Sequence, residues 1–310
     1  MTTRREFIRS LPAAGTAFAV TGGLLDEAPA RGEEPAPVPG HFHPKGKAPS
    51  KFTAEVLKKA KEALPLADRR DLDEQKKGFL APMKPLEIPA DAGHTAWDMA
   101  QFQFLDKQDE YDSIHPSLLR QSVLNNNYGL YEVVPGIYQV RGVDLANITF
   151  IKGKTGWIVF DVMASTETAR AAWALFQEHV GNKLPVSAVV YSHSHGDHWG
   201  GVRGIVDEKD VRAGKVPVIA PRDFLEHTIS ENVYAGNVMN RRLFYQYGIL
   251  LPASPYGFVG QGLGQAVSAG RIGLIAPTRI VERRLSAGGL YRVTTALQNT
   301  LSTDAPSAMN

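Results

Sequence analysis

Apolar residues recur at helical spacing near the start of the chain. Between residues 52 and 67 they alternate with lysines in the pattern of an amphipathic helix. The flanking stretches, 31–50 and then up to about residue 100, are polar and contain several prolines. We expect residues 31–100 to form a linker and a helical arm that packs on the main domain.

From residue 123 onward the pattern changes to short runs of β-branched and aromatic residues. The runs lie at residues 129–134, 137–140, 147–151 and 157–160. Turn residues separate them, including Pro135-Gly136 and the glycine-containing stretch 152–156. The sequence therefore predicts an antiparallel meander.

A helix and a buried strand are expected after the meander. Residues 166–179 place alanine, leucine and phenylalanine on one helical face, and residues 186–191 form a continuous apolar run. A polar loop begins at His193, where that strand ends, and two glycines then lead into a helix expected near Val202. This order is typical of half an αββα sandwich, which is an α/β fold.

Composition narrows the possible partners and chemistry. The 310 residues include 34 Lys and Arg against 32 Asp and Glu, so no overall field favours nucleic acid or a membrane surface. We expect a small-molecule partner, no nucleic acid and no stable membrane anchor. The chain has no cysteine, which excludes disulfides, thiolate metal ligands and a cysteine nucleophile. Any metal must bind to histidine and carboxylate.

The first thirty residues have the pattern of an export signal. Two adjacent arginines, Arg4 and Arg5, precede a weakly apolar run at 11–25. This run is shorter than the roughly 20 residues that span a bilayer, and the small residues at 28–30 suit signal peptidase. We expect residues 1–30 to direct twin-arginine export, and the protein to be periplasmic or secreted.

A dense cluster of metal-binding residue types follows the predicted buried strand. His193, His195, Asp197 and His198 lie within six residues. Residues two apart in an extended loop point the same way, so the first two histidines can share one ion while Asp197 and His198 face a second. Imidazole nitrogen and carboxylate oxygen suit zinc, manganese or iron. Two ions would acidify a bridging water, so the sequence predicts a binuclear, zinc-binding hydrolytic centre.

The spacing H-x-H-x-D-H and several longer segments resemble the bacterial alkyl sulfatases of the metallo-β-lactamase superfamily. The segments are SIHPS at 113–117, GIYQVRG at 136–142, TGWIVFD at 155–161, HWGGVRG at 198–204, SENVYAGNVMNRR at 230–242 and GLIAPT at 273–278. The resemblance runs from about residue 100 to the C-terminus. It implies a metallo-β-lactamase fold and an enzyme with two zinc ions that hydrolyses alkyl sulfate esters to an alcohol and inorganic sulfate. Neither the alkyl-chain preference nor the choice between attack at carbon and at sulfur follows from it.

The resemblance also implies which residues bind metal. His193, His195, Asp197 and His198 match the family's ligands, and we expect Asp197 to be catalytic as well. The family has a further carboxylate ligand in a Thr-Glu-Ala-Pro motif. This chain has TDAP at 303–306, so Asp304, one methylene shorter, is the expected counterpart.

Four other residues are candidates for supporting roles. Asp161 resembles the family aspartate that supports metal-binding histidines by hydrogen bonding, although it could simply be a turn residue that ends a strand. Asn237, Arg241 and Tyr247 offer donors that could bind sulfate, because a guanidinium can donate two parallel hydrogen bonds to an oxyanion.

The family continues past the position matching Asn310, with a further glutamate ligand, a further histidine ligand, a dimerisation region and a sterol-carrier-like domain. We therefore expect a C-terminally truncated chain and a homodimer for the full-length family. The predicted plan is a signal peptide at 1–30, a linker and arm at 31–100, and an incomplete catalytic domain at 101–310. Two alternatives stay open: another hydrolase of the superfamily, of lactamase or thioesterase type, and an inactive metal-binding fragment.

Overall fold

The computed structural model describes residues 46–107, 111–181, 183–282, 299–300 and 308–309, which all fall within one compact unit. The expected export signal at 1–30 and the expected ligand Asp304 lie outside the described residues. None of the helices in the described part combines the length and the apolar character needed to cross a lipid bilayer.

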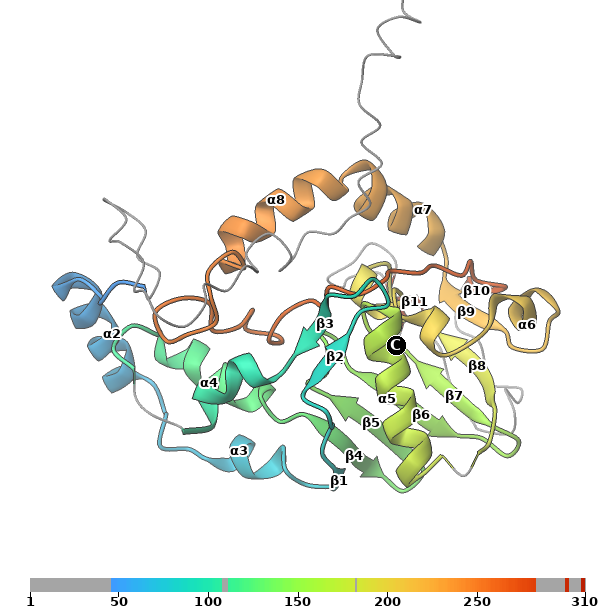
Figure 1. The fold of residues 1–310 in the computed structure, drawn as a ribbon, viewed down its shortest axis with the longest axis horizontal. Coiled ribbons are helices and arrows are strands. Elements are labelled where there is room, and N and C mark those ends of the chain that lie inside the picture. Colours follow the sequence, from blue (N-terminus) through green and yellow to red (C-terminus); the bar gives the residue numbers. More distant parts are fainter. Residues whose placement is uncertain (1–45, 108–110, 182, 283–298, 301–307, 310) are drawn as a thin grey trace, which may run out of the picture. The chain divides into compact units, whose positions relative to one another are not determined.

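An eight-stranded mixed sheet lies at the centre of the described unit (Figure 1). Its spatial order is β1 (Phe79–Ala81), β4 (Gly129–Val134), β5 (Ile137–Arg141), β6 (Ile148–Lys152), β7 (Trp157–Phe160), β8 (Val186–Val190), β9 (Val218–Pro221) and β10 (Arg279–Val281). Strands β1 to β7 pair antiparallel, which confirms the predicted meander. Strands β7 to β10 pair parallel.

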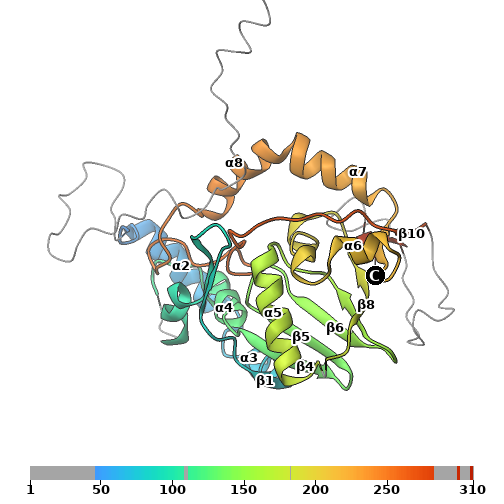
Figure 2. The same cartoon turned by 45° about the vertical axis from the view of Figure 1, so that its right-hand side comes forward.

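Helix α5 (Thr166–His179) connects β7 to β8 and covers one face of the sheet (Figure 2). It begins where the Ser165 side chain accepts a hydrogen bond from the Thr168 backbone. Its Phe176 stacks on Phe150 with ring centroids 4.0 Å apart and meets the Trp157 ring edge-on at 4.7 Å. The predicted helix at 166–179 and the predicted strand at 186–191, observed as β8, are confirmed.

The segment before the meander contributes both to the sheet and to separate helices. Its elements are α2 (Lys51–Ala63), α3 (Arg70–Glu74), the β2–β3 hairpin (Glu87–Pro89 and Thr95–Asp98), the 3-10 helix η1 (Ala100–Lys107) and α4 (Pro116–Asn125). Strand β1 is the edge strand of the main sheet, and Ile88 and Trp97 of the hairpin lie in the main core. The described part of the expected arm, residues 46–100, therefore shares one core with the segment that follows it.

Helix α2 ends earlier than the predicted residue 67. Leu64 has an extended backbone, with φ −94° and ψ 145°. The ring of the following Pro65 disfavours helical geometry at the residue before it, so the helix stops at Ala63.

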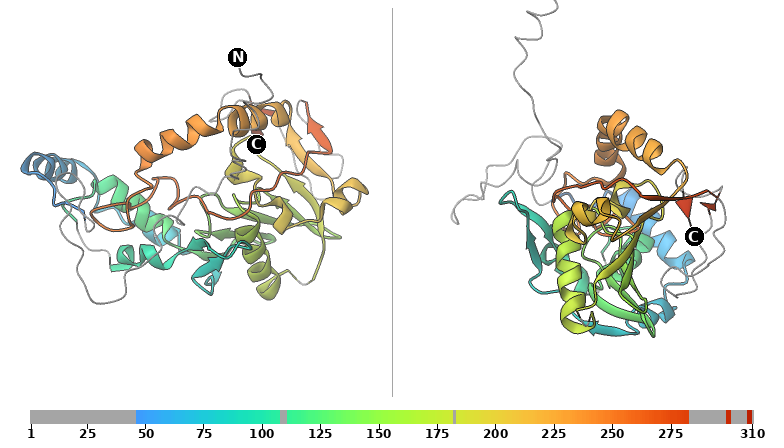
Figure 3. Two further views of the ribbon diagram at one scale, coloured as in Figure 1. Left: turned by 45° about the horizontal axis from the view of Figure 1, so that its top comes forward. Right: turned by 90° about the vertical axis from the view of Figure 1, so that its right-hand side faces the viewer.

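Short helices surround the loop after β8 and the strand β9. They are η2 (Gly196–His198), η3 (Val202–Gly204), α6 (Glu208–Arg212), α7 (Phe224–Ile229), the π-helix η4 (Ser230–Tyr234) and α8 (Gly236–Tyr247). Helices α7 and α8 form an arch over the sheet (Figure 3). The helix expected near Val202 is only one 3-10 turn. The glycines before it serve close packing, because a β-carbon on Gly201 would overlap the carbonyl oxygen of Val162 and lie 2.6 Å from that of Ser165.

The described residues thus contain one of the two sheets of an αββα sandwich with its helix layer, as the predicted partial sandwich requires. The other described strands form two-stranded ribbons, namely β2–β3 and the pair β11 (Asn299–Thr300) and β12 (Ala308–Met309).

A buried aspartate fixes the connection between β7 and α5. Asp144 accepts hydrogen bonds from the backbone of Ala164 at 3.1 Å, from the Thr168 hydroxyl at 2.6 Å and from the Ser268 hydroxyl at 2.6 Å. Burial raises the pKa of Asp144 above its usual value, and these donors offset part of that rise. The network holds the turn that begins at Asp161 against α5 and residue 268.

Replacing Phe176 by alanine is expected to destabilise the fold by about 3–5 kcal/mol, because the buried ring would leave a cavity between α5 and the sheet. The measurement is urea unfolding followed by circular dichroism. Phe52→Ala is the matched control, since that ring is 68% exposed and should change stability by less than about 0.5 kcal/mol. Equal losses for the two variants would contradict this account of the core.

Candidate metal centre

The candidate centre lies where two adjacent parallel strands end. Asp161 follows β7 directly, and residues 192–198 follow β8. The two segments are joined because the Asp161 backbone N–H donates to the Val190 carbonyl at 2.9 Å and the Ser192 N–H donates to the Asp161 carboxylate at 2.8 Å. Carboxyl ends of parallel strands are where α/β folds place their binding sites.

The loop after β8 brings the three predicted histidines together. The ring centroid of His193 lies 4.6 Å from that of His195 and 4.1 Å from that of His198. His193 is buried, with 7% of its surface exposed, whereas the other two rings are partly exposed. Asp197 is close as well, with its Oδ2 3.3 Å from His198 Nε2.

Asp161 orients the His198 ring through a hydrogen bond. The His198 Nδ1–H donates to Asp161 Oδ2 at 2.7 Å, and the Ser192 hydroxyl donates to the same oxygen at 2.8 Å. Asp161 has a left-handed backbone, with φ 55°, which aspartate tolerates better than most residues. A carboxylate behind one ring nitrogen of a histidine fixes the direction of the other, as in many metal sites. Asp161 thus accepts a hydrogen bond from one of the predicted metal ligands, and its supporting role in metal binding stays a prediction.

Charge pairing dominates this site when no metal is bound. Burial lowers the pKa of His198, but hydrogen bonds to the Asp161 and Asp197 carboxylates outweigh burial and raise that pKa to about 10. Burial alone would raise the pKa of Asp197, yet the neighbouring His198 charge lowers it overall. At neutral pH His198 is therefore an imidazolium between two carboxylates, and a cation that binds there has to replace its proton.

The imidazole and carboxylate side chains of the loop are of the types that bind divalent metals. Those of the described residues supply only part of a coordination shell. Imidazole nitrogens and a carboxylate oxygen are the ligands that zinc and related ions prefer. As they stand, however, no three His, Asp or Glu side chains of the described residues are grouped so as to hold an ion. The pairing of His198 with Asp197 gives one reason, because it directs a metal-binding nitrogen at a carboxylate. The residue types therefore fit a divalent metal, but further ligands have to complete its coordination shell.

A carboxylate that the sequence interpretation overlooked lies beside the cluster. Glu231 Oε1 is 3.5 Å from His195 Nε2, and both side chains are partly exposed. Glu231 belongs to the π-helix η4, a rare element that is frequent at functional sites. On the preceding helix α7, the Thr228 hydroxyl donates to the Ser194 carbonyl at 3.4 Å. The segment formed by α7 and η4 therefore contacts the loop at two points. The segment SENVYAGNVMNRR already contained this glutamate, but its closeness to His195 could not be deduced from one sequence.

The three predicted sulfate-binding residues all lie on α8, and the structure sets Tyr247 apart from the other two. Asn237 and Arg241 are exposed on α8. Tyr247, at the end of α8, packs against the apolar cluster that includes Phe102 and Phe258. Their binding of sulfate stays a prediction, as does metal binding by Asp304, which lies outside the described residues.

Replacing Asp161 by asparagine is expected to weaken divalent metal binding about 10- to 100-fold, because His198 loses its charged hydrogen-bond acceptor. Competitive titration against a chromophoric chelator measures the affinity. Asp223→Asn is the control, since Asp223 has a similar left-handed backbone, with φ 59°, and follows β9 away from the loop. If both variants bind metal like the parent chain, Asp161 has no supporting role.

Replacing Glu231 by glutamine is expected to weaken metal binding by about 10-fold, at the lower end of the range for outer carboxylates, because its contact with His195 is long. The same titration applies, with the exposed Glu226→Gln on α7 as the control. An unchanged affinity would show that Glu231 is only a neighbour of the cluster.

Comparisons with known proteins agree with this geometry. An (R)-specific secondary-alkylsulfatase from Pseudomonas sp. is 45% identical over 258 residues, covering 83% of this chain and 38% of the relative. A linear primary-alkylsulfatase from Pseudomonas sp. is 44% identical, covering 84% and 39%. An alkyl/aryl-sulfatase from Saccharomyces cerevisiae is 42% identical, covering 82% and 39%.

A solved structure gives the same result for the fold. The stereoselective inverting sec-alkylsulfatase from Pseudomonas sp. superposes with a TM-score of 0.79 at 43% identity, covering 86% of this chain and 42% of that one. The chain therefore spans about two fifths of the length of these relatives. The sequence profile of the metallo-β-lactamase superfamily matches residues 141–301, just over half of the chain. Together with the histidine–aspartate loop at the end of β8, this match shows that the chain belongs to the metallo-β-lactamase superfamily, whose members bind divalent metal.

Proposed function

We propose that this protein hydrolyses alkyl sulfate esters to an alcohol and inorganic sulfate, with zinc as the metal. The observation that carries the proposal is the loop His193, His195, Asp197 and His198, positioned by Asp161, in a chain 42–45% identical to three sulfatases. The names of these relatives share one reaction class, sulfate ester hydrolysis, over linear primary, secondary and aryl substrates.

The residues of the loop would have different roles in the site. His193 and His195 would hold one ion, and Asp197 and His198 a second. A bound divalent metal supplies Lewis acidity and makes water a stronger acid. Asp161 keeps His198 in one orientation through its 2.7 Å hydrogen bond, which limits the reorganisation needed on metal binding. Asp197 is partly exposed and its pKa is lowered by the neighbouring His198, so its carboxylate can accept a hydrogen bond from a water next to the substrate.

Two routes of hydrolysis are compatible with this assignment. The relative described as inverting must form a bond from water oxygen to carbon, because configuration inverts only at the attacked atom. An aryl sulfate instead requires attack at sulfur, since an aromatic carbon resists backside attack. Hydrolysis in ¹⁸O-labelled water separates the routes, because the label enters the alcohol in the first case and the sulfate in the second.

A second candidate function is metal binding without catalysis. One observation favours it: no three His, Asp or Glu side chains of the described residues are grouped so as to hold an ion. Metal counting on the purified protein tests it. Metal held without sulfate release would support this candidate, and two tightly held ions per chain together with sulfate release would rule it out.

We also propose that the protein is exported by the twin-arginine route and acts on a small alkyl sulfate as a homodimer. The pattern at residues 1–30 and the resemblance to alkyl sulfatases support these proposals. Fractionation of expressing cells with and without a functional twin-arginine translocase would test the export route, and light scattering would test the dimer.

The purified chain loaded with zinc is expected to release inorganic sulfate from dodecyl sulfate and to leave a lactam intact. His195→Ala should lower the sulfate release rate by at least 100-fold, because one ion loses a ligand. His179→Ala, at an exposed position in the last turn of α5, is the control and should keep the parent rate. Lactam opening without sulfate release would overturn the proposed substrate, and an undiminished rate in His195→Ala would overturn the proposed site.

A further inference from the structure

A second feature of the fold has the form of a binding site. Helices α2, α3 and α4 enclose a cavity of about 440 Å³. Pockets of about 300–1,000 Å³ are the usual size for small organic ligands. None of the residues that line this cavity belongs to the loop 192–198 or to Asp161, so it is separate from the candidate metal centre.

The floor of the cavity is apolar. Its branched aliphatic side chains come from α2, from α3 and the connection before it, and from α4 and the residues before it. They are Leu57, Leu66, Leu72, Ile114, Leu119 and Val123. Of these, Leu72 and Ile114 are also part of the buried core, so the floor is set by the fold itself. A cavity lined in this way holds apolar groups better than water.

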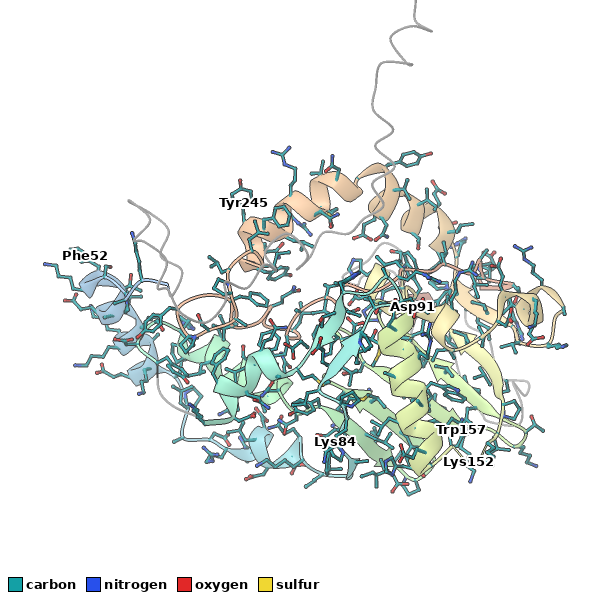
Figure 4. All side chains as sticks on the ribbon, viewed as in Figure 1. Phe52, Lys84, Asp91, Lys152, Trp157 and Tyr245 are labelled. Atoms are coloured by element: carbon teal, nitrogen blue, oxygen red, sulfur yellow. The ribbon has the colours of Figure 1, made fainter. Side chains whose placement is uncertain are left out.

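Helix α2 does not fill the space beneath it. None of its described side chains is buried. Phe52, labelled in Figure 4, is 68% exposed and Val56 is 62% exposed. Most helices in proteins are stabilised by packing an apolar face, and α2 lacks that burial. A ligand in the cavity would cover the apolar α2 side chains that line it, Ala54 and Leu57.

The charges around the cavity are mainly positive. Lys58, Lys61, Arg69 and Arg120 line it, against a single acidic lining residue, Asp112. Lys58 and Lys61 are exposed and lie one turn apart on α2, so their aliphatic stems can border the apolar floor. Arg120 contacts Asp71 at 3.3 Å, but this aspartate is 71% exposed and the pair is screened by solvent.

From this apolar floor with a cationic rim, we propose that the cavity binds a single-chain amphiphile with an anionic head group. The chain would lie over Leu57 and Leu119, and the head group would contact Lys58 and Lys61. This binding requires no metal and no hydrolysis, so it is independent of the proposed sulfatase activity.

The test uses the whole purified chain, in the presence of EDTA, and decyl sulfonate as the probe. This compound has an anionic sulfur head group but no ester bond, so it cannot be hydrolysed at the metal centre. Isothermal titration below the critical micelle concentration is expected to show saturable binding. The double variant Lys58→Ala/Lys61→Ala should weaken that binding by at least tenfold, whereas Lys59→Ala, an exposed α2 lysine outside the lining, should not change it.

Further experiments distinguish the contributions of the apolar floor and of the charged rim to amphiphile binding. Ala54→Trp should fill the cavity and abolish binding while circular dichroism stays unchanged, since Ala54 lines the space from α2. Decanoate should bind like the sulfonate, and decyl trimethylammonium should bind at least tenfold more weakly. A photoreactive analogue should label residues in the ranges 51–72 or 111–123.

Three results would overturn the proposal. The first is the absence of saturable binding below the micelle concentration. The second is equal affinity for the cationic and anionic amphiphiles, or for the lysine double variant and its control. The third is labelling confined to the loop 192–198, which would place the ligand at the metal centre instead. If the cavity were covered by a second copy of the chain, Ala54→Trp would change the oligomeric state rather than amphiphile binding.

Discussion

The site depends on the parallel pairing of β7 with β8. That pairing aligns the ends of both strands, so Asp161 follows one strand and residues 192–198 follow the other. The Asp161 N–H then donates to the Val190 carbonyl, and the Ser192 N–H donates to the Asp161 carboxylate, which also accepts a hydrogen bond from His198 at 2.7 Å. Helix α5 makes the parallel arrangement possible by crossing the sheet between the two strands, with Phe176 and its neighbours buried against it.

The loop is further confined by segments that are distant in sequence. Asp144 and Ser268 hold the turn after β7, and Gly201 allows the backbone after the loop to approach Val162 closely. On the other side, α7 and η4 contribute Thr228 and Glu231. Such support matters because a metal site tolerates only small displacements of its ligands.

Charge pairing stabilises the cluster of histidines and carboxylates in the loop 192–198. Three imidazoles and several carboxylates at close range would be unstable without mutual compensation, and His198 compensates by pairing with both Asp161 and Asp197. The same pairing occupies both ring nitrogens of His198, so a metal ion that binds this ring has to displace Asp197 from its Nε2 atom. The cavity beneath α2 follows a different principle, apolar enclosure with a positive rim, and shares no lining residue with this cluster.

The sequence by itself determined the local elements and the chemistry of the loop. Alternating apolar residues defined the meander, helical spacing defined α5, and the offsets between His193 and His198 identified the metal-ligand types, because these features depend only on neighbours along the chain. The tertiary structure decided the rest. The edge position of β1, the contact between Glu231 and His195, the close approach of Gly201 to Val162, and the cavity between α2 and α4 all join residues far apart in sequence. No local pattern encodes such distances, since they arise only when separate elements pack together.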